Sequence, residues 1–306
     1  MATTMTAIKD RYIVLQKALT SYFENDIDSG RVSQLTLQTT RMQREYGFSA
    51  SDMGVAYIQV IHAALMNVVP TIFWVLANVF SRPKLLADLR DEALGAIKQR
   101  ELPDGRRQVS VEVGRLETLC PKLTSVFRET LRLTSVSTLY RRVLKDTSIS
   151  ENIDGVSGRS YLLKKGVTIM ISKIVGSRNP ALWESTGAPT DAFDPERFLQ
   201  WTEKKNGADA AARKKAYYPF GGGKELCPGR NFAATEVLGL MVVLLNGFEI
   251  TSAAKVDAPI VLPEPAKPKM TTGVMHPDKK SDLRARIRRR PGWENVEWSP
   301  WYTEDT

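Results

Sequence analysis

The sequence predicts a mainly α-helical protein of the α+β class, helix-rich with small β-sheets. Apolar residues recur at helical spacing through most of the first half. After residue 137 the chain changes to short apolar segments separated by glycine and asparagine–aspartate turns, a pattern typical of strands. The chain has 306 residues, of which 42% are apolar, so it has enough material for a sizeable core.

Several segments of the first half are expected to be helices. Two of them carry proline in the first turn, where a missing backbone N–H leaves no hydrogen bond unmade. A polar turn is expected at residues 102–108. The expected helices are residues 4–25, 32–46, 53–81, 82–99 and 120–135.

The strands are expected in the second half of the chain. A long helix is expected to begin just after Cys227 and to stop near Asn246 and Gly247, with a strand following it. The other expected strands lie within residues 138–146, 161–172, 271–276 and 284–289.

The expected helix at residues 53–81 permits two interpretations. It contains no Asp, Glu, Lys or Arg and is long enough to cross a bilayer. Polar residues such as Gln59, Asn67 and Asn78 would be unfavourable in hydrocarbon, however. A long helix through the core of a large protein has the same pattern, and we favour that interpretation.

The net charge and the cysteine content limit which classes of protein the sequence can belong to. The net charge is +9, and much of the excess lies in short basic clusters. These clusters fit either a solvated surface or a surface for an acidic protein partner, and no nucleic acid is expected. The two cysteines, Cys120 and Cys227, indicate no disulfide framework, which favours a reducing compartment. The clusters are Lys204–Lys205, Arg213–Lys215 and residues 284–290.

A glycine-rich loop around Cys227 carries the strongest functional signal. The stretch YYPFGGGKELCPGRNFA places three glycines before this cysteine and Gly229 after it. Glycine at this density permits tight turns or the close approach of a large flat group. A phosphate-binding loop is excluded, because Tyr218 and Glu225 stand where that motif needs glycine and serine or threonine.

Several roles remain open for Cys227 on its residues alone. A zinc site lacks local spacing to His62, Cys120 or His276, and two histidines give little support to a catalytic thiol–histidine pair. A buried structural cysteine is a further alternative. Because Cys227 directly precedes a predicted helix, unpaired N–H groups there would stabilise a thiolate, which is a strong ligand for iron.

The stretch FGGGKELCPG resembles the haem-binding loop of the cytochrome P450 family, F-x-x-G-x-[R/H]-x-C-x-G. Phe220, Gly223, Cys227 and Gly229 stand at the family's positions. The resemblance implies that Cys227 is the axial ligand of haem iron and that the other three residues border the haem. Glu225 departs from the pattern, which has a basic residue there for a haem propionate, and a lysine stands one position before it.

Two further motifs of this family occur in the expected order. FRETLRL contains E-x-x-R as Glu129 and Arg132, whose spacing places both on one helix face. FDPERF supplies Arg197, which by resemblance completes a buried structural cluster with them. Each of these motifs taken alone would also fit exposed charged side chains. The motifs together favour the resemblance to this family. Arg141 stands where family members often carry an arginine to a haem propionate.

The expected central helix departs from the commonest family pattern. Met66 and Asn67 stand where most members carry an acid–threonine pair that steers protons to bound dioxygen. Asn67, followed by Pro70 and Trp74, resembles a smaller branch with the bile-acid-forming sterol hydroxylases, including sterol 7-alpha-hydroxylases, and prostacyclin synthase. Asn67 is therefore predicted to be catalytic by ordering a water, with a structural polar residue as the alternative.

The resemblance implies a haem-thiolate monooxygenase that hydroxylates or otherwise oxidises a lipophilic, sterol-like or secondary metabolite. The cofactor would be haem b, and electrons would come from NADPH through cytochrome P450 reductase. That reductase would dock on the clusters at residues 204–205 and 213–215. Residues 271–275 resemble the late turn that enters the substrate pocket. The alternatives are a haem-thiolate isomerase or dehydratase that does not use dioxygen, and a truncated non-catalytic remnant.

The resemblance extends from about Met53 to Arg290 and implies a part of the family fold. Residues 1–306 are expected to form a single incomplete cytochrome P450 domain that lacks the N-terminal anchor and the early helices and strands. Full-length relatives are expected at the endoplasmic reticulum membrane, and this chain without an anchor is expected in the cytoplasm. The interpretation requires a Cys227 sulfur with open space beside it.

Overall fold

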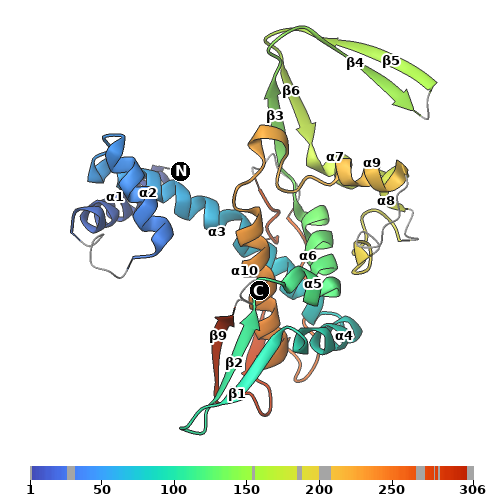
Figure 1. The fold of residues 1–306 in the computed structure, drawn as a ribbon. Coiled ribbons are helices and arrows are strands. Elements are labelled where there is room, and N and C mark those ends of the chain that lie inside the picture. The colour runs from blue at the N-terminus through green and yellow to red at the C-terminus, as the bar shows by residue number, and fades with distance from the viewer. Residues whose placement is uncertain are drawn as a thin grey trace, which may run out of the picture. The chain divides into compact units, whose positions relative to one another are not determined.

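The structure is a computed structural model, which describes residues 2–25, 32–153, 156–184, 188–199, 208–266, 273–278, 280–281 and 283–301. It is rich in helices and carries small sheets, which confirms the predicted fold class (Figure 1). The chain divides into two compact units, Met1–Asn67 and Val68–Thr306. The long helix α3, Ala50–Phe80, runs through the boundary between them.

The first unit is built from α1 (Ala2–Asn25), α2 (Gln34–Glu45) and the start of α3. Its small core contains Phe23 and Met53, which are both buried. The Phe23 ring packs edge-on against the Tyr57 ring, with the ring centroids 5.4 Å apart. Aromatic contacts therefore join the first and third helices of this unit.

The core of the second unit is formed by helices that pack around α10 (Arg230–Gly247), and Figure 1 shows α4 and α6 near it. Leu89, Val126 and Leu238, from three different helices, are all inaccessible to solvent. From Val237 onward α10 is almost entirely apolar, which is the pattern of a helix buried within a core. Its partners are α4 (Pro83–Leu94), α5 (Leu116–Leu119) and α6 (Pro121–Thr134).

A three-stranded sheet lies beside this core and corrects two predictions. Its strand order is β1-β2-β9, with β1 antiparallel to β2 and β9 parallel to β2. The predicted helix at residues 82–99 ends at Leu94, because Gly95 caps it and the next segment pairs with β2. Strands therefore also occur in the first half. The bounds are β1 Ile97–Glu101, β2 Arg107–Glu112 and β9 Val296–Trp301.

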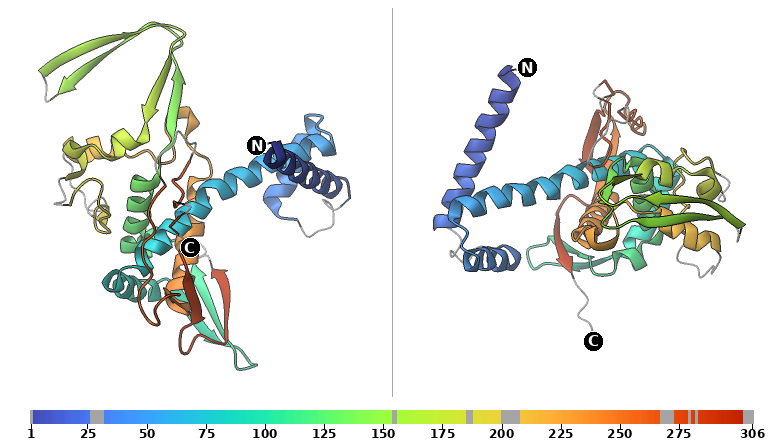
Figure 2. Two further views of the ribbon diagram at one scale, coloured as in Figure 1. Left: turned by 180° about the vertical axis from the view of Figure 1, so that it is seen from behind. Right: turned by 90° about the horizontal axis from the view of Figure 1, so that it is seen from above.

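Four strands form two antiparallel two-stranded sheets that follow each other away from α6. The strands β3 and β6 pair with each other, and β4 pairs with β5 nearer the tip, as the left view of Figure 2 shows. Between the two pairs, the amide of Val143 donates to the carbonyl of Val167 at 3.0 Å. The bounds are β3 Thr138–Arg142, β4 Thr147–Ile153, β5 Val156–Leu163 and β6 Thr168–Ser172.

The remaining elements are short. The strand predicted at residues 271–276 is absent from residues 273–276, which form only an isolated bridge between Val274 and Ser135, and residues 271–272 lie outside the described residues. The strands β7 and β8 form an antiparallel pair. The bounds are α7 Lys173–Ser177, α8 Pro180–Trp183, α9 Ala208–Ala216, the 3₁₀ turn η3 Gly223–Glu225, β7 Phe248–Ser252 and β8 Ala285–Arg289.

Among the described residues, α3 is the one helix long and apolar enough to cross a membrane. One third of its most apolar window is buried within the protein. In the second unit, Val75, Ala77 and Val79 of this helix are fully buried in the core. That part of α3 therefore matches the predicted core helix.

Candidate functional site at the cysteine loop

The cysteine loop, residues 217–229, closes on itself just before α10. The amide of Cys227 donates to the carbonyl of Phe220 at 2.9 Å, and the amide of Gly221 donates to the carbonyl of Tyr218 at 3.0 Å. Gly221 and Gly223 have φ values of +80° and +65°, which residues with a Cβ rarely adopt. The glycines thus allow the chain to reverse and present Cys227 at the start of α10.

Space lies open beside the glycines of this loop. A Cβ atom on Gly222 or Gly223 would meet no described atom within 4 Å, and one on Gly229 would meet only the Cys227 sulfur, at 3.9 Å. The Cys227 side chain is itself half-buried rather than enclosed. The side chain of Phe220 packs against the core and holds the base of the loop. The Cys227 sulfur is therefore partly accessible, and the predicted approach of a large flat group stays a prediction.

The two cysteines differ in their surroundings. Cys120 is fully buried, and burial together with the nearby Glu92 carboxylate raises the pKa of its thiol to about 12. A thiol with that pKa stays protonated and is a poor metal ligand. The described residues contain no group of three or more His, Cys, Asp or Glu side chains placed to hold a metal ion. Cys227 is thus the accessible sulfur, and no zinc site accompanies it in the described part of the chain.

Two arginines bond to the backbone of the cysteine loop. Arg141 on β3 donates through Nη2 to the carbonyl of Gly222 at 2.9 Å. Arg230, at the start of α10, donates through Nη1 to the carbonyl of Cys227 at 3.2 Å. A guanidinium has five N–H donors, so Arg141 retains donors after its bonds to Gly222 and to its neighbour Tyr140. Its predicted contact with a haem propionate stays a prediction.

The three predicted cluster residues lie together and buried. Glu129 and Arg132 form a bidentate pair on α6, with Nε–Oε2 and Nη2–Oε1 distances of 2.7 Å and 2.8 Å. Arg197 adds a third bond to Glu129, from Nε to Oε1 at 3.1 Å. None of the three side chains is more than 1% exposed, so the charges interact in a medium that screens them weakly.

Two positive groups share one carboxylate in this cluster, and backbone carbonyls compensate for the excess charge. Arg132 donates to the carbonyls of Ser177 and Thr190 at 2.7 Å and 2.6 Å. Arg197 donates to the carbonyls of Trp183 and Pro189. Because buried charges without such partners are strongly unfavourable, these carbonyls are held at the cluster by the two arginines.

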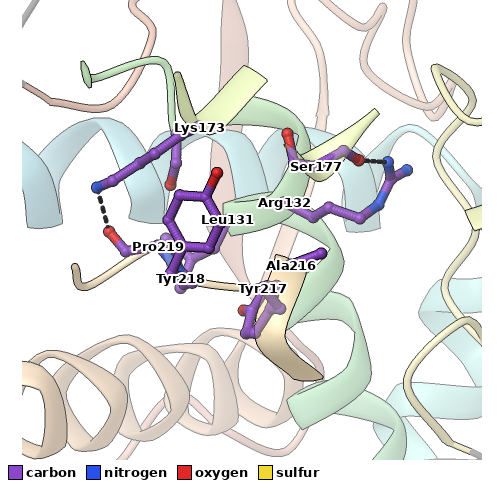
Figure 3. A pocket seen from close by; sticks show the side chains of 9 residues that line it. Leu131, Arg132, Lys173, Ser177, Ala216, Tyr217, Tyr218 and Pro219 are labelled. Carbon is purple, nitrogen blue, oxygen red and sulfur yellow. Dashed lines mark hydrogen bonds between the residues drawn. The ribbon is translucent and has the colours of Figure 1, made fainter. Parts of the chain in front are cut away.

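The short helix α7 connects this cluster to the cysteine loop. Its last residue, Ser177, accepts the bond from Arg132, and its first residue, Lys173, donates through Nζ to the carbonyl of Pro219 at 2.6 Å (Figure 3). The hydroxyl of Tyr218 donates to the carbonyl of Ser172, directly before α7, at 3.1 Å. The last residue of α7 is therefore bonded to the Glu129 cluster, and its first residue is bonded to the cysteine loop.

Three packed aromatic rings also connect this part of the fold to the cysteine loop. The rings of Trp183, Phe198 and Tyr217 pack together, and the centroids of Phe198 and Tyr217 are 4.9 Å apart. The hydroxyl of Tyr217 donates to the carbonyl of Arg128 on α6 at 3.1 Å. Tyr217 is the first residue of the cysteine loop, so this packing fixes where the loop begins.

The comparison with known families decides the identity of this arrangement. A family model described as Cytochrome P450 matches residues 3–281. The chain belongs to the cytochrome P450 family. Members of this family bind haem, and the cysteine loop and the buried Glu129 cluster lie within the matched region. The match begins well before Met53, so it also covers the helices of the first unit, and it ends before β8 and β9.

Similar curated proteins are cytochrome P450 enzymes of fungi and mammals. The chain is 33% identical over 272 residues to a cytochrome P450 monooxygenase of Gibberella zeae, covering 89% of this chain and 50% of the relative. It is 30% identical to the monooxygenase nodJ of Hypoxylon pulicicidum, with coverage of 81% and 46%. It is also 30% identical to the 25-hydroxycholesterol 7-alpha-hydroxylase of Rattus norvegicus, with coverage of 81% and 57%. The chain spans about half the length of the curated relatives it matches.

The structure describes the position of Asn67 and of part of the late turn. Asn67 is exposed on the part of α3 that belongs to the first unit, and its catalytic role stays a prediction. The late turn is described from Gly273 to Met275, whereas residues 271–272 lie outside the described residues. Trp74 donates through Nε1 to the carbonyl of Met275 at 2.6 Å, which ties this turn to the buried part of α3.

The basic clusters divide between exposed and internally bonded residues. Lys214 and Lys215 on α9 are exposed, whereas Lys204 and Lys205 lie outside the described residues. In the cluster at residues 284–290, Arg288 pairs with Asp257, and Arg290 bonds to Glu249 and to the carbonyls at the end of α10. Part of that last cluster therefore supports the fold.

Sequence reasoning missed three side chains whose hydrogen bonds hold the cysteine loop in place. Lys173 and Tyr218 belong to no motif that the sequence displays, and Arg230 reads as an ordinary charge in the first turn of a helix. Their partners are backbone carbonyls as far as 46 residues away. No local pattern signals such bonds, so only the folded chain identifies these residues.

Proposed function

We propose that this chain carries the haem-thiolate site of a cytochrome P450 monooxygenase and that Cys227 is the axial ligand of the haem iron. The observation that carries the proposal is the half-buried Cys227 sulfur at a glycine-lined opening. The residues around it fit a flat macrocycle, because Gly222 and Gly223 leave space that a side chain would fill. Phe220, Gly223 and Gly229 would border the haem, and Arg141 would use its remaining donors on a propionate.

The haem would supply activation of dioxygen, which a thiolate ligand promotes in this family by donating electron density. The residues of this chain would hold the sulfur in place and exclude water from it. The bonds from Cys227 to Phe220 and from Arg141 to Gly222 keep the loop closed. The buried cluster at Glu129 and the helix α7 would keep the loop in register with the rest of the second unit.

The substrate would be a lipophilic small molecule, either sterol-like or a secondary metabolite. Sterol hydroxylases of mammals and monooxygenases of fungi among the relatives support this class. Val274 and Met275 in the late turn are apolar and would contact such a substrate. Asn67 would order a water that relays protons in place of the usual acid–threonine pair.

Electrons would come from NADPH through cytochrome P450 reductase. Lys214 and Lys215 are exposed on α9, a few residues before the cysteine loop, and an acidic partner would dock there. Residues 1–306 would act as one incomplete P450 domain, because the family match runs through both compact units. Full-length relatives would lie at the endoplasmic reticulum membrane.

A haem-thiolate isomerase or dehydratase is the second candidate, favoured by Met66 and Asn67 in place of the acid–threonine pair. The test is turnover of a sterol panel, which includes 25-hydroxycholesterol, by the haem-loaded chain with labelled dioxygen, NADPH and reductase. A monooxygenase incorporates labelled oxygen and consumes NADPH. Conversion of a lipid peroxide without NADPH would assign the isomerase instead. A haem-loaded chain that converts neither class would be the non-catalytic remnant.

A further inference from the structure

Lys173 is an unusual residue because its charge is buried. It is the first residue of α7, only 9% of its surface is exposed, and its Nζ lies 2.6 Å from the carbonyl oxygen of Pro219. Among the residues that the structure describes, no carboxylate lies within ion-pairing distance of it. A buried ammonium without a carboxylate is unfavourable unless its other interactions compensate for the lost hydration.

The bond from Lys173 is made at a sensitive point of the cysteine loop. Pro219 directly precedes Phe220, whose carbonyl accepts the amide of Cys227. A shift of the Pro219 carbonyl would therefore move the group that closes the loop.

The surroundings of Lys173 leave room for little else. A cavity of about 10 Å³ lies beside it, which is enough for about one water molecule, and Tyr218 and Ser177 are among the residues that line it (Figure 3). Burial lowers the pKa of Lys173, whereas the Cys227 thiolate acts to raise it.

We propose that Lys173 is a positioning residue for the cysteine loop, which fastens the loop at the Pro219 carbonyl. The fastening concerns the protein alone. Its effect on how long a haem stays bound to Cys227 rests on the function proposed above.

The first test measures amide hydrogen exchange in the haem-free chain with mass spectrometry. The variants are Lys173→Gln, Lys173→Arg and, as a matched control, Lys165→Gln, which removes an exposed lysine in the turn between β5 and β6. Loss of a charged hydrogen bond predicts about tenfold faster exchange in peptides that cover residues 217–229 of Lys173→Gln. Peptides from α10 serve as an internal reference. Unchanged loop exchange in Lys173→Gln would overturn the proposal.

Global unfolding of Lys173→Gln would appear as faster exchange in α10 as well as in the loop. In that case the variant Lys173→Arg decides whether Lys173 positions the loop. Arginine keeps the charge and the donors, so protection of the loop equal to that of the wild type supports the proposal. Loop protection in Lys173→Arg that falls by the same factor as the protection of α10 would contradict it.

The second test separates this proposal from the assignment of haem. The haem-loaded proteins are reduced, exposed to carbon monoxide and followed over time for the red-shifted Soret band of thiolate ligation. Lys173→Gln is expected to lose this band faster than the wild type and Lys165→Gln. Equal rates would show that fastening of the loop by Lys173 does not stabilise thiolate ligation. A wild type that never shows the band while Lys173 protects the loop would refute the haem assignment and leave the positioning role intact.

Discussion

Arg197 and Glu129 meet across 68 residues of sequence, with Nε of the arginine 3.1 Å from Oε1 of the carboxylate and both side chains inaccessible to solvent. Arg132 holds the same carboxylate from the other side. Through Ser177 the cluster reaches α7, and through Lys173 that helix reaches the cysteine loop. The conformation of the loop thus depends on charges that lie outside it.

Replacement of Glu129 by glutamine should destabilise the protein strongly. The change leaves Arg132 and Arg197 buried without a counter-charge, so we expect the free energy of unfolding to fall by about 3–5 kcal/mol. Urea denaturation measures this change. The control is Glu117→Gln, which removes an exposed partner of Arg128 and should cost less than about 1 kcal/mol. Equal losses in the two variants would contradict the structural role of the cluster.

Gly176→Ala should disturb the contact between α7 and the cysteine loop. A Cβ atom at this position would lie 2.5 Å from the hydroxyl of Tyr218, which is held by its bond to Ser172. Crowding of this kind costs about 1–3 kcal/mol, which exceeds the gain of about 0.5–1 kcal/mol from alanine in a helix.

Tyr218→Phe provides the matched variant for this contact, because it removes the hydroxyl that the new Cβ would meet. The double variant Gly176→Ala, Tyr218→Phe should be less destabilised than the sum of the two single changes. A double-mutant cycle in urea measures the difference. Simple additivity would show that the two residues do not interact in the way that the geometry indicates.

The buried thiol of Cys120 should make stability depend on pH in alkaline solution. Burial raises its pKa from 9.0 to about 12, so between these values the unfolded chain loses the proton while the folded chain keeps it. Stability must then fall as the pH rises, by about 0.7 kcal/mol per pH unit at pH 9, where half of the unfolded thiols are ionised, and by nearly 1.4 kcal/mol per pH unit above about pH 10. Well below pH 9 the thiol contributes almost no slope. Comparison of wild type and Cys120→Ala from pH 9 to 10 tests this, and equal slopes would contradict it.

Trp74→Phe should loosen the late turn. The change removes the donor to the Met275 carbonyl, which would remain buried without that partner, and we expect a loss of about 1–3 kcal/mol. Amide exchange should rise at Met275, whose own amide donates to Thr134, while the interior of α6 stays protected. Uniform protection in wild type and variant would show that Trp74 does not hold this turn.

Local patterns predicted the helices well because those helices carry their own signals. The helical spacing and the proline in the first turn of α6 both lie within a few residues of each other. The end of α4 was predicted wrongly, because Ile97–Glu101 has helix-compatible residues and becomes a strand only by pairing with β2. The strand β9 was missed for a related reason, since its parallel partner β2 lies far away in the sequence.

The residues of the candidate site likewise differ in whether a local sequence motif reveals them. Cys227, Phe220 and the glycines stand within one short motif, and Glu129 and Arg132 are three residues apart, so resemblance to the family was sufficient to single them out. Lys173 acts on a carbonyl 46 residues away, and its residue type alone indicates an exposed charge. Its role emerges only when burial and the hydrogen bond are both known.

The central claim is that the Cys227 sulfur binds haem iron, and a reduced carbon monoxide spectrum of the purified chain with added haemin tests it most directly. The wild type and Cys120→Ala should both give the red-shifted Soret band of thiolate ligation, and Cys227→Ala should not. A wild type without this band, or a Cys227→Ala variant that keeps it, would contradict the account.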